Sequence, residues 1–348
     1  MENSIVASEM SMVSKPYLLS IQCMTYNQSA YITDALNGFT MQRTNFPFVA
    51  VVVDDASTDG EQEVIKSYVD EHCDYATESG YKEWETEDAY WTFAQHKENE
   101  NCHIVVACLK RNLYREQDKK EEVIKDWMNA KYIALCEGDD YWTDPLKLQK
   151  QVDFMEAYPD YSLCFTNTIV KHVGFDEVAV NHIWDTYSIE DLIGNNALNA
   201  KSRGDNIVSC GHTSTLLYRR PEWPLPNWIS RCYIGDEPLF IALAQYGKAK
   251  FINEQTSVYR AMVGVSSKDF KQEVDWQNRI QMYEIINEGL GYKYRTIIDP
   301  IIAQWYLKLC KLTWKKKNKK EAIMNFYKSI VADRKTVMRW ITGKIRSH

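Results

Sequence analysis

The sequence lacks the spacings that mark several common kinds of functional site. Its nine cysteines include no Cys-x-x-Cys pair, so they match neither a zinc site nor a regular disulfide framework. There is no Gly-x-Gly-x-x-Gly fingerprint and no Gly-x4-Gly-Lys-Ser/Thr loop, which argues against a dinucleotide oxidoreductase and a P-loop nucleotidase. A calcium loop counted from Asp55 fails, because its twelfth position is Lys66 instead of glutamate.

Long apolar runs are also missing. No stretch approaches the ~18–20 apolar residues that cross a bilayer, and the first residues lack the basic start and apolar stretch of a secretory signal. Irregularly spaced cysteines suit a reducing compartment. These absences predict a soluble, cytoplasmic protein, or one that is peripheral at the inner face of a membrane.

The charge of the chain is unevenly distributed. The 348 residues have a net charge of −7, yet residues 301–348 hold 13 Lys and Arg against 2 Asp and Glu. These basic residues alternate with Trp, Leu, Ile and Tyr, as in amphipathic helices that lie on anionic bilayers. Contact with a membrane is therefore expected, and an ordinary solvated helical face is the alternative. Nothing resembles an RNA- or DNA-binding module.

Apolar runs typical of strands alternate with amphipathic segments typical of helices. Strands are predicted at 17–24, 46–55, 102–110, 131–137 and 161–170, and helices at 29–39, 60–72, 119–130 and 145–158. This alternation predicts an α/β domain whose mostly parallel sheet is flanked by helices. Ligands bind such sheets beyond the carboxyl ends of the strands, which is where Asp54, Asp55 and the acidic stretch 137–140 lie.

Other segments depart from this alternation. Residues 74–101 are acidic and aromatic without a clear period, which predicts an excursion from the core that serves as a lid or a partner surface. A further helix is expected at 235–247, with short strands at 249–253 and 256–260. Residues 267–348 are expected to be helical.

Four short motifs follow one another along the chain: TYNQ (25–28), VVVDDASTDG (51–60), EGDDYW (137–142) and GDEPLF (235–240). In this order and spacing they resemble the family 2 glycosyltransferases, which have the GT-A fold, and the resemblance extends over roughly residues 17–265. It implies a GT-A glycosyltransferase domain at 1–265 and a basic, helical C-terminal extension at 266–348.

The resemblance also implies a reaction. The chain would be an inverting, metal-dependent hexosyltransferase that moves a sugar from a nucleoside diphosphate, most readily UDP, to a hydroxyl of a growing glycan or lipid-linked glycan in cell-surface polysaccharide synthesis. A divalent cation can stabilise the diphosphate as it leaves. Because hard oxygen ligands suit Mn²⁺ and Mg²⁺, Asp140 is expected to hold the metal, and Asp139 to approach the ribose or the metal. The alternative is that both aspartates cap the next helix.

The resemblance assigns a general base as well. Asp236 would take the proton of the acceptor hydroxyl, while Glu237 would point elsewhere. The alternative is that both carboxylates only favour the helix N-terminus through its dipole.

Donor binding is assigned to the remaining motifs. Tyr26 would lie against the nucleobase with Asn27 beside it, Asp54 and Asp55 would bind the base and ribose, and Arg111 would contact a phosphate or uracil. The alternatives are an ordinary packed tyrosine at Tyr26 and an Asx-type turn at the aspartates.

Two further features bear on the predicted donor site: a pair of lysines and a departure from the family pattern. Lys119 and Lys120 are interpreted as a solvated helix start. Many relatives have a histidine where this chain has Met262, and methionine is a weak ligand for Mg²⁺ or Mn²⁺. Arg260, or Ser266 and Ser267, could reach the diphosphate instead.

Two other classes of protein were weighed. A nucleotidyltransferase on a similar fold would carry a Gly-rich, Arg-containing loop, which TYNQSAY is not. A non-catalytic protein that binds sugar nucleotides or glycans remains the alternative to the enzyme.

Overall fold

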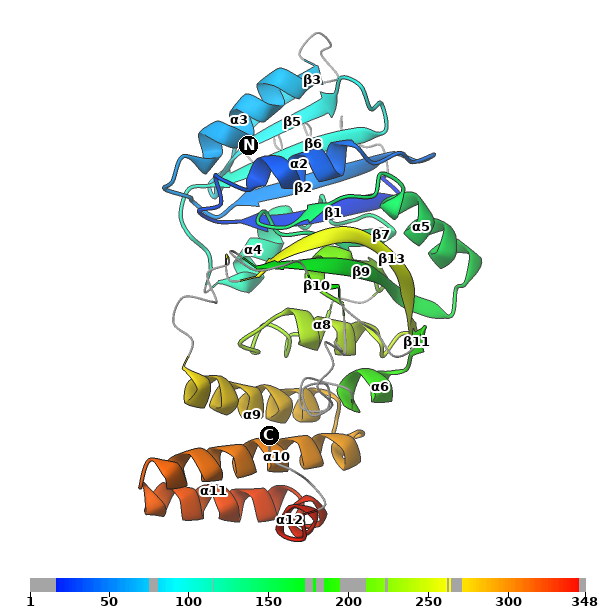
Figure 1. The fold of residues 1–348 in the computed structure, drawn as a ribbon. Helices are drawn as coiled ribbons and strands as arrows, with labels where there is room; N and C mark the ends of the chain where they lie inside the picture. Colours follow the sequence, from blue (N-terminus) through cyan, green and yellow to red (C-terminus); the bar gives the residue numbers. More distant parts are fainter. Residues whose placement is uncertain are drawn as a thin grey trace.

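The computed structural model describes residues 17–74, 81–114, 116–172, 178–179, 185–194, 211–222, 225–261, 263 and 271–343. They form one mixed β-sheet with helices on both faces and a layer of helices at the C-terminal end (Figure 1). The predicted α/β class, with its flanked sheet and helical C-terminal region, is confirmed.

The elements that form this fold have the following bounds. The strands are β1 (Leu19–Thr25), β2 (Phe48–Asp54), β3 (Cys73–Asp74), β4 (Tyr81–Glu85), β5 (Ala89–His96), β6 (Cys102–Leu109), β7 (Tyr132–Leu135), β8 (Tyr141–Trp142), β9 (Tyr161–His172), β10 (Val178–Ala179), β11 (Thr186–Tyr187), β12 (Leu216–Arg219) and β13 (Lys248–Ala261). The helices are α2 (Ile32–Thr40), α3 (Glu61–His72), α4 (Gln117–Ile124), α5 (Lys147–Ala157), α6 (Ile189–Gly194), the 3₁₀ helix η2 (Thr213–Thr215), α8 (Asp236–Leu243), α9 (Gln272–Gly289), α10 (Arg295–Lys315), α11 (Lys319–Ala332) and α12 (Arg334–Ile341).

The centre of the sheet is parallel. Strands β7, β1, β2 and β6 lie side by side and run in one direction, so their carboxyl ends meet at one edge. At that edge Thr25 of β1 pairs with Asp54 of β2. All seven residues of β2 are buried, as expected for an apolar strand covered on both faces.

Alternate residues of each strand point to opposite faces, and each face has its own core. On one face, β1 and β2 pack against α2, α3 and α5. On the other face, β2, β5 and β6 pack against residues of α4, while β7, β9 and β12 pack against α6, α8, α9 and α10. The predicted helices therefore serve as the two layers that bury the sheet.

The prediction for residues 74–101 was wrong over residues 81–96. There β4 and β5 form an antiparallel hairpin, and β5 pairs along its length with β6. Ala89, Trp91, Phe93 and Ala94 are buried. The alternation of β5 is short, because only Tyr90 and Thr92 separate its buried positions, and the charged residues of β4 and of the turn precede it. The hairpin extends the sheet instead of leaving it.

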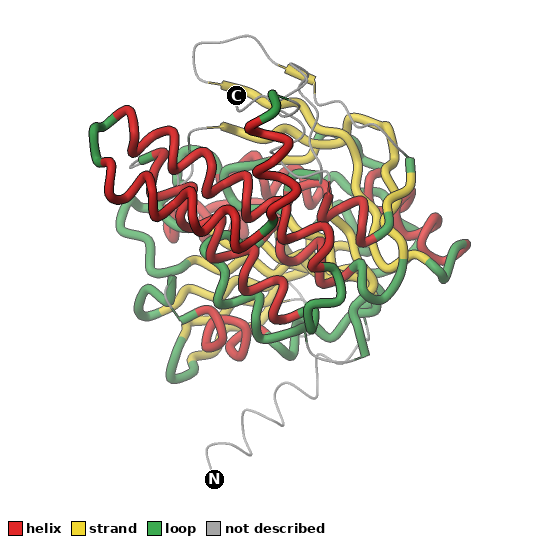
Figure 2. Tube along the Cα trace, turned by 90° about the horizontal axis from the view of Figure 1, so that it is seen from below, coloured by secondary structure: helices red, strands yellow, loops and turns green. Residues whose placement is uncertain are grey.

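The C-terminal half differs from expectation in one strand. The two short strands expected at 249–253 and 256–260 form a single strand, β13, whose pairing with β9 contains register shifts. Helices α9 and α10 share one hydrophobic core with the sheet, and Figure 2 shows the C-terminal helices lying across it. The division of the chain near residue 265 stays a prediction. No helix within the described ranges has the length and apolarity required to span a bilayer.

Candidate functional site

Three of the predicted motifs meet at the carboxyl edge of the parallel strands. The loop after β1 contains TYNQ, the loop after β2 contains DDASTDG, and the loop after β7 contains EGDD. Backbone hydrogen bonds continue from the strands into these loops, because the Asp55 N–H donates to the Thr25 carbonyl (3.0 Å) and the Gly138 N–H donates to the Met24 carbonyl (3.1 Å). The topology thus brings the two acidic clusters to either side of β1.

A buried glutamate joins the first two loops. Glu61, at the start of α3, is fully buried and accepts hydrogen bonds from the hydroxyl of Thr25, the N–H of Gln28 (3.0 Å) and the hydroxyl of Ser57 (2.8 Å). Burial raises the pKa of Glu61, and these donors partly oppose the rise. This role of Glu61 was not predicted, since a glutamate in the first turn of a helix usually interacts only with the helix dipole.

Further hydrogen bonds fix the same two loops. Asn27 has a positive φ of 53°; its N–H donates to the Ser57 hydroxyl (2.9 Å), and its side-chain carbonyl accepts from the Thr58 N–H (2.8 Å). Asp59 accepts from the N–H of Ser29 (3.0 Å) and from the N–H of Glu61 (3.2 Å). Asn27 was predicted to bind the donor, and it also holds the loops after β1 and β2 together. Tyr26 beside it is half-buried.

Close packing against the first loop explains why a glycine, Gly138, stands inside the acidic stretch. A Cβ on Gly138 would lie 2.2 Å from the Thr25 Oγ1 atom and 2.6 Å from the Gln28 Oε1 atom. The third loop can approach the first only where no side chain intervenes. Gly138 therefore lets the carboxylates on either side of it stand next to the TYNQ loop.

We expect Gly138→Ala to lower the free energy of unfolding by about 1–3 kcal/mol, the usual cost of overpacking. The matched control is Gly194→Ala, whose added methyl would lie 3.5 Å from Ile297, an ordinary contact. Urea titration of both variants measures the difference. Equal midpoints for the two would contradict the close packing of the three loops.

The third loop concentrates negative charge. Asp140 is buried, whereas Glu137 and Asp139 are partly exposed. Burial, with repulsion from Asp139, raises the pKa of Asp140 to about 7. Burial, with repulsion from Asp140 and Asp139, raises the pKa of Glu137 to about 8. Each carboxylate is thus less stable as an anion than it would be in water.

Arg260 of β13 contacts this loop directly. Its N–H donates to Asp140 Oδ1 (2.9 Å), and its guanidinium donates to the Asp139 carbonyl (2.7 Å) and pairs with Asp34. The guanidinium also lies over the ring of Tyr141, 4.4 Å from its centroid. These contacts hold the loop against β13, and the expectation that Arg260 reaches the diphosphate stays a prediction.

Asp236 and Glu237 have different surroundings. Glu237 is buried and accepts a hydrogen bond from the Tyr283 hydroxyl, so it faces the helical core. Asp236 is exposed at the start of α8, and its Oδ1 accepts from the Glu237 N–H (2.8 Å). The charge of Asp236 contributes to the raised pKa of Glu137, as repulsion between neighbouring carboxylates does. Asp236 is therefore electrostatically coupled to the acidic loop.

His212 lies in the same neighbourhood. Its ring stacks on Tyr259 with centroids 4.2 Å apart, and burial lowers its pKa to about 4 although Asp236 opposes the shift. Tyr259 also feels the charges of Asp140, Asp139 and Asp236, which add to the effect of burial and raise its pKa to about 12. His212 and Tyr259 are thus a stacked pair within electrostatic reach of Asp236, and Tyr259 is also within reach of the acidic loop.

The two aspartates that end β2 differ in what they can still bind. Asp54 is fully buried, and its Oδ2 accepts from the N–H of Ser57 (3.1 Å) and the amide of Gln62 (2.5 Å), while its Oδ1 has no hydrogen-bond partner among the described residues. Both oxygens of Asp55 are occupied, by the N–H of Leu113 (2.6 Å) and the ammonium of Lys120 (2.7 Å). This geometry makes Asp54 a better candidate than Asp55 for binding the donor nucleotide.

The interpretation of the two lysines was right for one at most. Lys120 is 5% exposed, and its ion pair with Asp55 is buried. Lys119 is partly exposed and pairs with Asp88 (2.7 Å). The inward orientation of Lys120 was not predictable from local sequence, because its buried partner Asp55 lies 65 residues away along the chain.

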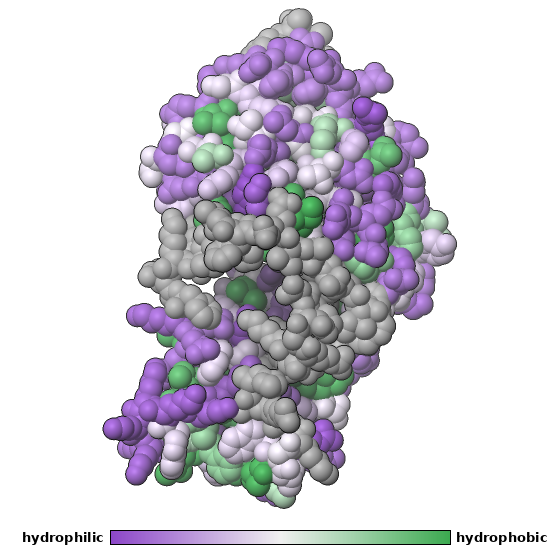
Figure 3. Space-filling model, in the orientation of Figure 1, coloured by the Kyte–Doolittle hydropathy of each residue, from purple (hydrophilic) through white to green (hydrophobic). Residues whose placement is uncertain are grey.

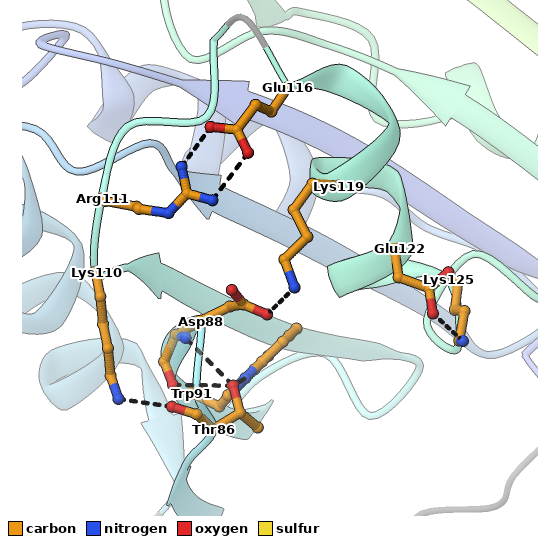
Figure 4. Close-up of polar contacts among 10 residues, drawn as sticks. Thr86, Asp88, Trp91, Lys110, Arg111, Glu116, Lys119, Glu122 and Lys125 are labelled. Carbon is orange, nitrogen blue, oxygen red and sulfur yellow. Dashed lines mark hydrogen bonds and ion pairs between the residues drawn. The ribbon is translucent and has the colours of Figure 1, made fainter.

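Arg111 stands on the exposed turn before α4. Figure 4 shows its guanidinium facing Glu116, with two parallel contacts, one of them 2.9 Å between Nη2 and Oε2. To bind a phosphate, Arg111 would exchange this surface ion pair for the ligand, and such pairs are worth little in water. Its predicted role stays a prediction. Met262, Ser266 and Ser267 lie outside the described residues.

The acidic loop meets the chemical requirement for a divalent cation. Asp139 and Asp140 offer hard oxygen ligands, and burial raises the pKa of both carboxyl groups, so a bound cation would stabilise their anionic forms. In the part of the chain that the structure describes, no three His, Cys, Asp or Glu residues are grouped to enclose a metal ion. Two protein carboxylates leave most coordination positions to a substrate, which suits Mg²⁺-like ions bound together with phosphates.

Comparison with known proteins agrees with the motifs. Residues 20–79 match the family model described as glycosyl transferase family 2. This segment contains TYNQ and VVVDDASTDG, whereas EGDDYW and GDEPLF lie beyond it. The match supports a sugar-transfer function.

The curated relatives are uncharacterized proteins of Mycobacterium bovis and Mycobacterium tuberculosis. Each is 35% identical over 151 residues, which is 42% of this chain and 34% of the relative. The aligned part is thus about a third of the length of these relatives.

Solved structures that align with most of the chain include two proteins in complex with nucleotides, as their names state. TarS 1–349 of S. aureus in complex with UDP has a TM-score of 0.48 at 15% identity, over 93% of this chain and 91% of that one. The mannosyltransferase PcManGT from Pyrobaculum calidifontis, in complex with GDP-Man and Mn²⁺, has a TM-score of 0.45 at 12% identity, over 96% and 93%.

Proposed function

We propose that this chain, which belongs to glycosyl transferase family 2 over residues 20–79, is an inverting glycosyltransferase. Its donor is a nucleoside diphosphate sugar, with UDP as the nucleotide, and its acceptor is a hydroxyl of a growing or lipid-linked glycan. We place the reaction in cell-surface polysaccharide synthesis on the cytoplasmic side of the membrane. The observation that carries the proposal is that the loops containing TYNQ, DDASTDG and EGDD meet at one carboxyl edge of the parallel strands.

The loops after β1 and β2 are assigned to the nucleotide. Tyr26 would stack on the base, and Asp54 would use its unpartnered Oδ1 oxygen as a hydrogen-bond acceptor. Glu61 and Asp55 position these loops without needing to touch the donor. Asn27 and Arg111 are further candidates for contact with it.

The loop after β7 is assigned to the metal. Asp140, with Asp139, would hold Mn²⁺ or Mg²⁺, and such an ion supplies positive charge that stabilises a departing diphosphate. Arg260 holds the backbone of the loop, so that the two carboxylates keep their places. Asp236 is assigned to the acceptor. Its carboxylate would take the hydroxyl proton while the oxygen attacks the anomeric carbon and the bond from that carbon to the diphosphate breaks.

A direct test is to incubate the full chain with UDP-, GDP- and dTDP-sugars and Mn²⁺, first by thermal shift and then by release of nucleoside diphosphate. We expect UDP-sugars to raise the melting temperature most and to be hydrolysed slowly without acceptor. Stabilisation without any release of UDP, even with glycan acceptors, would favour a non-catalytic binding protein. No shift with any nucleotide would contradict the proposal.

We expect Asp140→Ala to weaken donor binding by about 10- to 100-fold in the presence of Mn²⁺. Loss of a residue that only hydrogen-bonds to a metal ligand already costs about that much, and Asp140 is proposed as a direct ligand. Without metal, the variant and the parent should bind UDP alike. Titration calorimetry with and without Mn²⁺ measures both affinities. The exposed Asp153→Ala on α5 is the control. A loss of affinity that is independent of metal would refute the role of Asp140 as a ligand.

A further inference from the structure

Helix α11 carries an apolar face on the side that points away from the protein. Ile323, Tyr327 and Val331 are 64%, 62% and 67% exposed, and Met324 is 51% exposed. Successive residues turn by about 100° around a helix axis, so these four share one side, which we call the α11 apolar face. The buried residues of the helix lie on the opposite side: Ala322, Asn325 and Ser329.

Basic side chains border this face. By the same rotation, Lys319 and Lys328 lie on its two flanks, and Lys320 lies within it; all three are exposed. Further exposed basic residues lie on the adjoining ends of α10 and α12 and between the helices: Lys315, Lys316, Lys317, Arg334, Lys335 and Arg339. Only Glu321 and Asp333 are acidic in residues 301–343, and Asp333 caps α12. The face is therefore apolar at its centre and positive around it.

The position of the helix leaves this face accessible. Figure 1 places α11 and α12 at the end of the molecule farthest from β1 and β2, with α10 between α11 and the rest of the fold. In Figure 3 hydrophobic and strongly hydrophilic residues stand next to one another in this lower part. Exposed Met338 and Ile341 of α12 add apolar surface at the same end.

We propose that the α11 apolar face binds the surface of an anionic lipid bilayer, with the helix in the plane of the headgroups. An apolar stripe between lysines is the pattern of interfacial helices, because the stripe enters the acyl boundary while the lysines reach the headgroups. A symmetric contact with a second copy of the chain is less favourable, since it would bring the two lysine borders together. The proposal does not depend on sugar transfer.

The first test is flotation of the full chain with vesicles. We expect binding to vesicles of phosphatidylcholine with roughly one third phosphatidylglycerol, and little binding to phosphatidylcholine alone. Binding should weaken when the salt is raised from about 0.1 M to about 1 M, since the Debye length falls from about 10 Å to about 3 Å. Absence of binding to the anionic vesicles would overturn the proposal.

The lysine border is tested with Lys319→Gln/Lys320→Gln/Lys328→Gln. Each lysine near an anionic surface contributes about fivefold to partitioning, so the triple variant should partition about 100-fold less. The control is Lys66→Gln on α3, where the side chain is 65% exposed. Equal partitioning of the triple variant and the control would remove the electrostatic part of the proposal.

The apolar face is tested with Ile323→Asp/Val331→Asp, and exposed Leu146→Asp before α5 is the control. We expect only the first variant to lose vesicle binding, with its unfolding transition unchanged because both positions are exposed. Light scattering tests the rival partner. If the variant turns a dimer into a monomer and still floats with the vesicles, the face binds a second copy and the membrane proposal is wrong.

Discussion

Asp236→Asn is expected to reduce turnover by about 10²- to 10⁴-fold while donor affinity stays within about twofold of the parent. A positioned general base contributes a rate factor of this size, and asparagine keeps the shape of the side chain without its basicity. Asp236 is exposed at the start of α8, so the replacement leaves no buried group unpaired. Release of UDP in the presence of acceptor measures turnover, and calorimetry measures the affinity.

Two variants separate this role from its alternatives. Asp118→Asn removes an exposed carboxylate from the first turn of α4, a matched helix position, and should not change turnover. Glu237→Gln alters the buried hydrogen bond to Tyr283 and should affect stability more than chemistry. If Glu237→Gln abolishes turnover in folded protein while Asp236→Asn retains it, the base has been assigned to the wrong residue.

The parallel centre of the fold was predictable because its information is local. β2 is a continuous run of apolar, mostly β-branched residues, and such a run is typical of a strand covered on both faces. The hairpin of β4 and β5 was not predictable in the same way. Its pairing with β6 decides which of its residues are buried, and that pairing is a property of the assembled sheet.

The residues of the candidate site also differ in whether local sequence is enough to predict them. The acidic loop after β7 and Asp54 were found from residue type and position after a predicted strand, whereas Asp236 was assigned by the resemblance to family 2 glycosyltransferases. Glu61 joins the loops after β1 and β2, which are neighbouring strands, and Arg260 joins β13 to the loop after β7, next to the pairing of β13 with β8. These neighbours are set by the assembled sheet. Sequence reasoning therefore identified candidate ligands more readily than the residues that hold them in place.

Lys120→Met is expected to lower the free energy of unfolding by about 3–5 kcal/mol. Both side chains of the Lys120–Asp55 ion pair are only 6% exposed, with 2.7 Å between Nζ and Oδ2. Methionine fills a similar volume but leaves the carboxylate of Asp55 buried without its cation, and that is the costly way to break a buried pair. Denaturant titration measures the loss. Lys119→Met, next in sequence and partly exposed against Asp88, should cost at most about 1 kcal/mol.

The double variant Asp55→Asn/Lys120→Met tests whether Asp55 positions the loop or contacts the donor directly. Removing the stranded charge should restore much of the stability, because the penalty arises from the unpaired carboxylate. The N–H of Leu113 still has an acceptor in the asparagine side chain, so the turn after β6 can keep its path. If Asp55 acts only by positioning the loop, Lys120→Met should lower donor affinity as well as stability, and the double variant should restore both. If stability recovers while affinity remains low, Asp55 contacts the donor directly and the preference for Asp54 as the ligand is wrong.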